Sequence, residues 1–294
     1  MQRTELLLIT ILVHLIGLLP FRMLYFLSDF LALFFIHFIH YRRKTIRTNL
    51  RNSFPEKTAA EIDALECEYY HHLCDILLES IKGLTMPAAE LQRRFALRNP
   101  EIFHPLFEKN ESAIVLASHF GNWEWGVLSL PLGVRHRVVG IYKPLSNPYI
   151  NDYLNRRRKK WGLHLTSMTG TGRTVVKYRS HPSLFVLIAD QTPSDVKHAH
   201  WLPFLHQDTP FHHGADKLAR QTGYPVFMVD IRRRRRGFYD VEFTELCRQP
   251  AQTKDGDITA LYAEKLEHLI RENPSQWLWS HRRWKRKRPG PLRG

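Results

Sequence analysis

The chain has 294 residues, 44% of them hydrophobic and 12% aromatic, which excludes general disorder and is enough to bury a full core. Its 43 Lys and Arg outnumber 28 Asp and Glu, giving a net charge of +15. Such a field favours an anionic partner, which means nucleic acid, an anionic membrane surface, or a phosphorylated substrate or carrier. The three cysteines are an odd, sparse set, typical of a reducing compartment, and exclude a disulfide framework.

The N-terminal segment, residues 1–41, is predicted to be a membrane anchor. Between residues 5 and 41 only Arg22 and Asp29 are fully charged in the interior, although neither apolar run around Pro20 reaches the roughly 18–20 residues of a clean spanning helix. A signal peptide and a buried soluble helix are the alternatives. We favour an anchor, either one tilted span or two short helices in one leaflet. The basic stretch "YRRKTIRTNLR" that follows is expected to face the anionic cytoplasmic surface.

The rest of the chain, residues 42–294, is predicted to form one α/β domain with a mostly parallel central sheet flanked by helices. Residues 42–112 have helical patterns, including "AAELQRRFAL". From Ala113 onward, short apolar strands alternate with helical segments, which favours a parallel sheet with ligands at the carboxyl ends of its strands. The expected strands are "AIVLAS", "RVVGIYK", "SLFVLIAD", "YPVFMVDI" and "FYDVEF".

The five-arginine run, residues 232–236, lies between the last two of these strands. A strand end and hairpin turn explain it better than nucleic-acid binding, because no nucleic-acid-binding module accompanies it. We expect a solvated basic rim, with contact to anionic lipid as the second interpretation.

The sequence "SHFGNWEW" places His119 where the strand "AIVLAS" ends. A histidine with an acid five residues later arises about once or twice by chance in such a chain. The surroundings are therefore the stronger argument: Gly121 permits a tight turn, and Glu124 falls in the first turn of the next helix. If Glu124 accepts the Nδ1 proton, the other ring nitrogen becomes a base that faces the cleft. No nucleophile-elbow serine accompanies it, so we expect base catalysis without a covalent enzyme intermediate.

The chain resembles the lipid A late acyltransferases, within the glycerolipid acyltransferases that carry an H-x4-D/E motif. The resemblance covers nearly the whole length, and it is carried by these segments: the N-terminal anchor, "HFGNWEW", "YKPLSNP", "GTGR", "LIADQ", "WLPFLHQDTPFHHGADKLARQTGYPV" and "PSQWLWSHRRWKRKRP". It implies a glycerolipid acyltransferase-like fold in which His119 is the general base and Glu124 its partner.

The resemblance also implies a reaction. A fatty acyl group moves from an acyl thioester, on acyl carrier protein or coenzyme A, to a hydroxyl of a lipid A precursor, and no other cofactor or metal is expected. Arg173, Lys143 and Gln191 are expected to hold phosphates or the oxyanion, with Asp190 and Asn122 completing the substrate-binding set. For Arg173 a surface helix arginine is an equal alternative, and for Asp190, at the end of its strand, helix capping is one. Relatives commonly have arginine where this chain has Lys143, and lysine lacks the planar fork for bidentate binding.

The expected location is the inner membrane of a bacterium, with the active site facing the cytoplasm. The acidic acyl carrier protein would be attracted by the basic residues 156–160 and the C-terminal tail. Acylation of another lipid, such as a lysophospholipid or glycolipid, and a non-catalytic protein that binds anionic membranes are the alternatives. The histidines between His198 and His213 have two alternative roles: they bind a metal ion, or they form a pH-sensitive loop over the active site. Trp277, Trp279 and Trp284 either anchor at the membrane interface or close the core.

Overall fold

The computed structural model describes residues 2–288, with side chains from Thr4 onward. The end of the basic C-terminal tail, residues 289–294, lies outside the described residues. The helices are α1 (Gln2–Leu18), α2 (Phe21–Phe34), α3 (Arg43–Ser53), α4 (Ala59–Gly83), α5 (Ala88–Arg94), α6 (His104–Glu108), α7 (Trp123–Gly133), α8 (Pro148–Arg158), α9 (Thr171–Tyr178), α10 (Gly214–Thr222) and α11 (Asp257–Glu272). The strands are β1 (Phe95–Leu97), β2 (Ala113–Ala117), β3 (Arg137–Tyr142), β4 (His164–Ser167), β5 (Ser183–Ile188), β6 (His200–Phe204), β7 (Gln207–Phe211), β8 (Val226–Arg235) and β9 (Phe238–Cys247).

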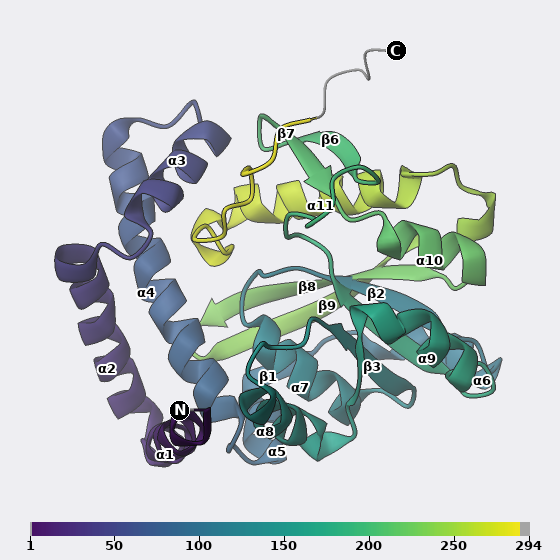
Figure 1. Ribbon diagram of the computed structural model, residues 1–294, viewed down its shortest axis with the longest axis horizontal. Coiled ribbons are helices and arrows are strands. Elements are labelled where there is room, and N and C mark those ends of the chain that lie inside the picture. The colour runs from purple at the N-terminus through teal and green to yellow at the C-terminus, as the bar shows by residue number, and fades with distance from the viewer. Residues whose placement is uncertain (1, 289–294) are drawn as a thin grey trace.

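Seven strands form one sheet in the order β1-β9-β8-β2-β5-β3-β4, and β6 and β7 form a separate hairpin. All neighbouring pairs in the large sheet are parallel except β8 and β9. Helices α10 and α11 cover one face, and α5 and α7 cover the other (Figure 1). The predicted α/β fold with a mostly parallel sheet is therefore confirmed.

Strand β2 shows why the sheet is covered on both faces. All five of its residues are buried. Ile114 and Leu116 belong to the apolar cluster that also contains the inner faces of α10 and α11. Ala113, Val115 and Ala117 alternate with them and belong to the cluster under α7. A strand buried on both faces has a continuous apolar sequence, as "AIVLA" does.

The expected strands from Ala113 onward are found at their predicted places, but four strands were not predicted: β1, β4, β6 and β7. The prediction of helix through Leu97 was wrong, because Phe95 leaves the helix and pairs with Tyr239 of β9. These four strands have only three to five residues each. Such short segments carry too little apolar alternation to be distinguished from loops.

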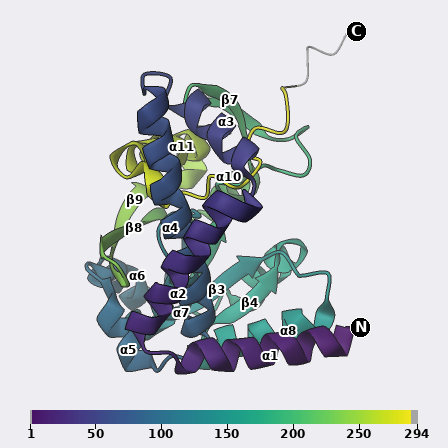
Figure 2. The same ribbon diagram turned by 90° about the vertical axis from the view of Figure 1, so that its left-hand side faces the viewer.

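The two N-terminal helices meet at Pro20 and run in different directions (Figure 2). Together with a π-helical turn, α2 gives an apolar helix over Phe21–Ile39 with a mean hydropathy of 1.6, long enough to cross a membrane, whereas α1 is shorter. One face of the pair packs on α4 and α8, where Val13 contacts Leu84 and Tyr153. The opposite face exposes large apolar side chains: Leu7, Leu8, Ile11, Leu12, Leu15, Met23, Phe26, Phe30, Leu33 and Phe38. The boundary after residue 41 remains a prediction.

The arginine run is not simply a solvated rim, so that expectation was wrong for two of its members. Arg233 and Arg236 each donate to the buried carboxylate of Asp75 on α4, at 2.7 and 2.6 Å. Arg236 also donates to Asp29 on α2, at 2.7 Å. These ion pairs join the β8–β9 hairpin to the helices that precede the sheet. A single sequence could not show this, because the acids are about 160 to 210 residues away.

Candidate active site

The turn between β2 and α7 carries His119. Gly121 has a φ of 59°, and a Cβ added there would lie 2.8 Å from the carbonyl oxygen of Ile231. Only glycine fits this left-handed, crowded position, as the predicted tight turn requires. Asn122 then caps α7 by accepting a hydrogen bond from the backbone N–H of Trp125 at 3.0 Å. The turn is thereby fixed, and His119 lies at the carboxyl end of β2.

The partner of the His119 ring is Asp190, just beyond the end of β5. The ring Nδ1 lies 2.7 Å from Asp190 Oδ1, and the backbone N–H of His119 donates to Asp190 Oδ2 at 2.8 Å. Strands β2 and β5 are parallel neighbours with Ala117 opposite Ile188, so the residues that follow them meet at one edge. The side chain of His119 is 16% exposed and that of Asp190 2%. The imidazole thus has a buried carboxylate at Nδ1 and keeps a small part of its own surface exposed.

The charge state of Asp190 decides the tautomer of His119. Burial alone would raise the pKa of Asp190, but the charge of His119 and the hydrogen bonds from its ring and backbone, with one from Trp277, outweigh burial and lower it. An ionised carboxylate only accepts hydrogen bonds, so Nδ1 of His119 carries the proton and Nε2 has a free lone pair. The side-chain amide of Gln191 lies 3.1 Å from that Nε2.

The C-terminal segment closes around this pair. Trp277 donates its indole N–H to Asp190 Oδ2 at 2.8 Å, and the backbone N–H of Leu278 donates to the carbonyl of His119 at 3.1 Å. Trp277 and Trp279 are buried at 3% and 0% exposure. Of the two interpretations of these tryptophans, closing the core is the one the structure supports. No sequence signal linked Trp277 to Asp190.

Glu124 lies in the first turn of α7 as predicted, but the expected hydrogen bond to His119 is wrong. Its two carboxylate oxygens accept from one guanidinium nitrogen of Arg158, the last residue of α8, at 3.0 and 2.9 Å. Neighbouring positions in sequence suggested Glu124, whereas Asp190 reaches Nδ1 because two strands lie side by side. Glu124 and Arg158 are each about one-quarter exposed, so their ion pair lies at the rim of the site.

The other predicted substrate-binding residues have different surroundings. The Asn122 side chain is fully buried, capping α7 and donating to Glu79 at 2.7 Å, so in this conformation it offers no group to a substrate. Lys143 follows β3 and Arg173 lies in the first turn of α9, both exposed at the edge of the sheet that carries His119. Within residues 2–288, no hydrogen bond joins either of these two cations to His119.

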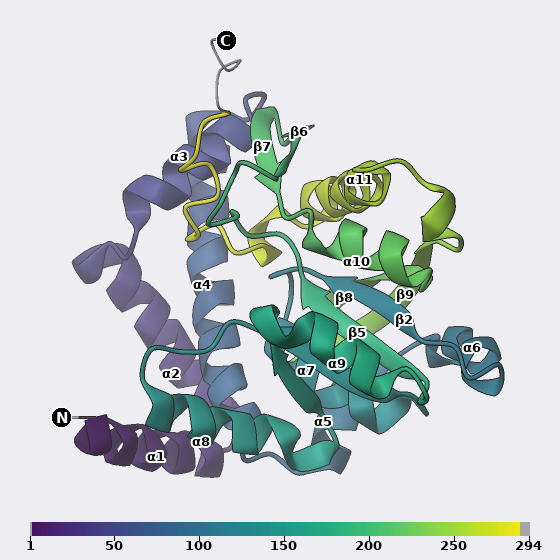
Figure 3. The same cartoon turned by 45° about the vertical axis from the view of Figure 1, so that its right-hand side comes forward.

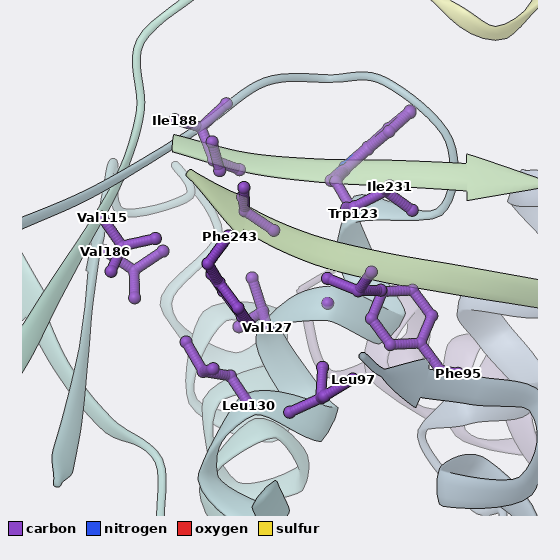
Figure 4. A pocket seen from close by; sticks show the side chains of 14 residues that line it. Phe95, Leu97, Val115, Trp123, Val127, Leu130, Val186, Ile188, Ile231 and Phe243 are labelled. Carbon is purple, nitrogen blue, oxygen red and sulfur yellow. The ribbon is translucent and has the colours of Figure 1, made fainter. Parts of the chain in front are cut away.

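An apolar cavity lies between the sheet and α7 (Figure 4). Ala117 and Trp123, on either side of the turn that carries His119, both line it. Its volume is about 30 Å³, and its lining comes from α7, the sheet and the residues near them: Phe95, Leu97, Val115, Ala117, Trp123, Gly126, Val127, Leu130, Val186, Ile188, Val229, Ile231, Val241 and Phe243. The ring of Trp123 also packs edge-on against His119, with centroids 5.1 Å apart. Trp123 therefore lines the cavity and also contacts the imidazole. It holds about one water molecule as it stands, so a longer apolar ligand requires the lining to move apart.

Fold and site together define an α/β protein with a histidine–carboxylate pair at the carboxyl edge of its sheet, beside an apolar cavity. The chain belongs to the bacterial lipid A biosynthesis acyltransferase family, whose model matches residues 2–286. It is therefore an enzyme of the acyltransferase class that acts in lipid A biosynthesis, and the resemblance seen in the sequence is confirmed.

Similar proteins with assigned reactions agree with this family. The chain is 23% identical over 290 residues to the lipid A biosynthesis lauroyltransferase of Escherichia coli K12, covering 92% of this chain and 88% of the relative. It is 22% identical over 271 residues to the lipid A biosynthesis palmitoleoyltransferase of the same organism, and equally similar to a lipid A biosynthesis acyltransferase of Shigella flexneri; both cover 91% of this chain and 86% of the relative.

Proposed function

We propose that the protein transfers a fatty acyl group from an acyl thioester, carried by acyl carrier protein or coenzyme A, to a hydroxyl of a lipid A precursor, with His119 as general base. The observation that carries this proposal is the 2.7 Å contact between His119 Nδ1 and the buried Asp190. It leaves Nε2 as a base at an opening where a hydroxyl can approach. Family membership supplies the acceptor class, and the donor and residue roles are our proposal.

In the proposed step, Nε2 of His119 removes the proton of the acceptor hydroxyl as its oxygen attacks the thioester carbonyl. The tetrahedral intermediate then collapses, the carbon–sulfur bond breaks, and the leaving thiolate takes the proton from Nε2. Asp190 stabilises the imidazolium formed in between, as in other histidine–carboxylate pairs. A base positioned in this way contributes about 10²–10⁴-fold to the rate. Gln191, whose amide now lies against Nε2, yields that place to the acceptor hydroxyl.

The acyl chain of the donor is proposed to enter the apolar cavity beside Trp123. This places the thioester carbonyl at the mouth of the cavity, next to the imidazole. Gly126 lines the cavity on the α7 side, and a Cβ there would lie 3.3 Å from Ile231 and 3.5 Å from Phe95, so a larger residue at this position would fill the cavity. Chain length would then be set by how far the lining residues allow the chain to penetrate.

The acceptor is proposed to approach along α8, which lies beside α1 (Figure 3). Arg158 forms an ion pair with Glu124, in the first turn of α7, which directly follows the turn that carries His119. Lys143 and Arg173 are exposed at the same edge of the sheet. These cations suit the phosphates of a lipid A precursor. Arg156 and Lys159 are also exposed on this side and suit an acidic carrier protein.

We propose that the protein lies at the bacterial inner membrane with its site facing the cytoplasm, and the apolar face of α1 and α2 supports the contact with a membrane. The exposed side chains there include Phe26 at 74% and Phe30 at 63%, a patch that a membrane would cover. Since α1 contacts α8 through Val13 and Tyr153, a membrane on this face would lie close to the rim of the site. A lipid acceptor could then reach His119 without leaving the bilayer surface.

The test is acyl transfer by the purified full-length protein in detergent or vesicles. Acyl carrier protein and coenzyme A thioesters are each offered with a lipid A precursor, a lysophospholipid and a glycolipid, and products are identified by mass spectrometry. We expect one additional ester on the lipid A precursor alone. Transfer to another lipid instead would overturn the acceptor. Absence of transfer from every donor to every acceptor would favour a non-catalytic membrane-binding protein.

A further inference from the structure

A second group of ionisable side chains lies away from the His119–Asp190 pair, where three segments of the chain meet. His200 begins β6, Asp216 lies in the first turn of α10, and Asp255 lies in the turn before α11. One ligand atom from each lies within 4.8 Å of the others. We propose that these three residues form a binding site for one divalent transition-metal ion, a role that the sequence left open for His200.

Among residues 2–288, two buried atoms in this group find no hydrogen-bond partner. Asp216 is 0% exposed, and its Oδ1 is unpaired while Oδ2 accepts from the backbone and hydroxyl of Thr259 at 3.3 and 3.5 Å. The Nε2 of His200 is also buried and unpaired. Buried polar atoms are almost always satisfied, because leaving one without a partner is costly. A carboxylate oxygen and a ring nitrogen without partners, on residues of the same cluster, are what a cation would satisfy.

Asp255 supplies the third ligand and the flexibility the site needs. Its side chain is 65% exposed, and its Oδ2 lies 4.0 Å from His200 Nε2. Metal–ligand bonds of about 2.0–2.2 Å place tetrahedral ligand atoms roughly 3.3–3.6 Å apart, so the ligands must close by less than about 1.5 Å. An exposed aspartate can make this movement. Arg220 donates to the other oxygen, Oδ1, at 2.7 Å and leaves Oδ2 for the metal.

The donor set indicates the kind of ion. One imidazole nitrogen with two carboxylate oxygens suits zinc and similar divalent ions, whereas magnesium and calcium prefer oxygen alone. The two carboxylates carry a charge of −2, and Arg220 offsets only part of it, so a divalent cation is electrostatically favoured. A fourth position stays open to water.

The position of the group indicates what the ion does. The segment between Asp190 and Gly214 contains the β6–β7 hairpin, and the proposed ion would tie the start of that hairpin to α10 and to the turn before α11. It would therefore hold in place the loop that leads away from Asp190. This is a structural role, distinct from the proton transfer proposed for His119.

The test uses the full-length protein, purified in detergent without a histidine tag and stripped of metal by a chelator. Zinc is titrated calorimetrically, and cobalt is added as a spectroscopic probe of coordination. We expect one zinc per chain and a higher unfolding temperature with zinc present. Asp216→Asn and Asp255→Asn are each expected to weaken zinc binding by at least about tenfold. Asp255 is exposed, so its variant decides the matter if the Asp216 variant does not fold.

The matched control is His268→Ala, which removes another histidine near a carboxylate, 3.6 Å from Glu272 and exposed on α11. It should bind zinc as the unchanged protein does. Zinc bound equally well by Asp255→Asn, or lost in His268→Ala, would overturn the proposed ligands. No zinc bound by the unchanged protein would overturn the site itself and leave a water molecule as the bridge between His200 and Asp216.

Discussion

Nδ1 of His119 lies 2.7 Å from Oδ1 of Asp190, although 71 residues separate the two in sequence. The contact exists because β2 and β5 are parallel neighbours whose carboxyl ends meet at one edge of the sheet. It replaces the local pairing with Glu124 that the motif spacing suggested. Glu124 is consequently free to hold Arg158 at the rim.

Asp190→Asn is expected to lower kcat by about 10²–10⁴-fold, because an amide no longer fixes the tautomer or stabilises the imidazolium. The rate is measured with saturating donor and acceptor. Asp195→Asn is the control, since this exposed residue lies on the same loop and, within the described part of the chain, its carboxylate accepts a single hydrogen bond, from the backbone N–H of Lys197. Full activity in Asp190→Asn would show that His119 does not depend on this carboxylate.

Glu124 and Arg158 are expected to act as one unit. Glu124→Gln, Arg158→Gln and the double variant are compared by kcat/KM for the lipid acceptor. Each single change disables the same ion pair, so kcat/KM of the double variant should be little lower than that of either single variant. The losses in transition-state free energy should therefore differ from a simple sum by about 0.5–3 kcal/mol. Independent losses that simply add would mean that Glu124 acts elsewhere, including directly on His119.

Glu79 on α4 is expected to make stability depend on pH. Its carboxylate accepts from Tyr25 of α2 and Tyr239 of β9, each at 2.8 Å, and from Asn122 at 2.7 Å. Burial is the main cause that raises its pKa, from 4.5 to about 7, partly offset by the tyrosine hydrogen bonds. The folded state therefore keeps this proton to a higher pH than the unfolded chain does.

As pH rises from about 4.5 to about 7, unfolding releases the Glu79 proton, so this residue stabilises the fold less and less. Glu79→Gln has no ionisable group at this position and so does not lose this stability as pH rises. The free energy of unfolding of the variant minus that of the unchanged protein should increase by about 2–3 kcal/mol between pH 5 and pH 8. Denaturant unfolding at both pH values measures this difference. A difference that does not change with pH would mean that Glu79 is ionised throughout.

Changing the size of the cavity should change which acyl chain is transferred. Gly126→Val fills it, because a Cβ there already lies 3.3 Å from Ile231 and 3.5 Å from Phe95, so shorter chains should be preferred. Phe243→Leu enlarges it and should favour longer chains. Mass spectrometry of products from mixed donors gives the distribution, with Leu261→Ala, at an exposed position of α11, as control. An unchanged distribution in both cavity variants would place the acyl chain elsewhere.

The sequence predicted the parts of the fold that depend on local pattern. Continuous apolar runs marked the central strands, and the glycine after His119 marked the turn that exposes it. Asp190 was recognised as a site residue because it directly follows an apolar strand. Its role as the partner of His119 was missed, because strand order determines which strand ends meet, and no local pattern encodes that order.

The remaining misses have the same physical origin. The contact of Trp277 with Asp190 joins residues 87 positions apart, and the pairing of Arg236 with Asp29 joins residues 207 positions apart. Ion pairs and hydrogen bonds of this kind depend on tertiary packing, so composition suggested a solvated arginine rim where Arg233 and Arg236 instead pair with the buried Asp75. The metal-site proposal at His200 likewise needed the structure, because its three residues come from separate segments.

The most direct test of the account is the acyl-transfer rate of His119→Ala, measured with purified protein, an acyl thioester and a lipid A precursor. His206→Asn, a change at an exposed histidine in the β6–β7 turn, serves as the control. We expect His119→Ala to lose about 10²–10⁴-fold in rate while it still folds and binds the donor, and the control to keep its rate. A His119→Ala enzyme that transfers the acyl group as fast as the unchanged protein would contradict His119 as the base.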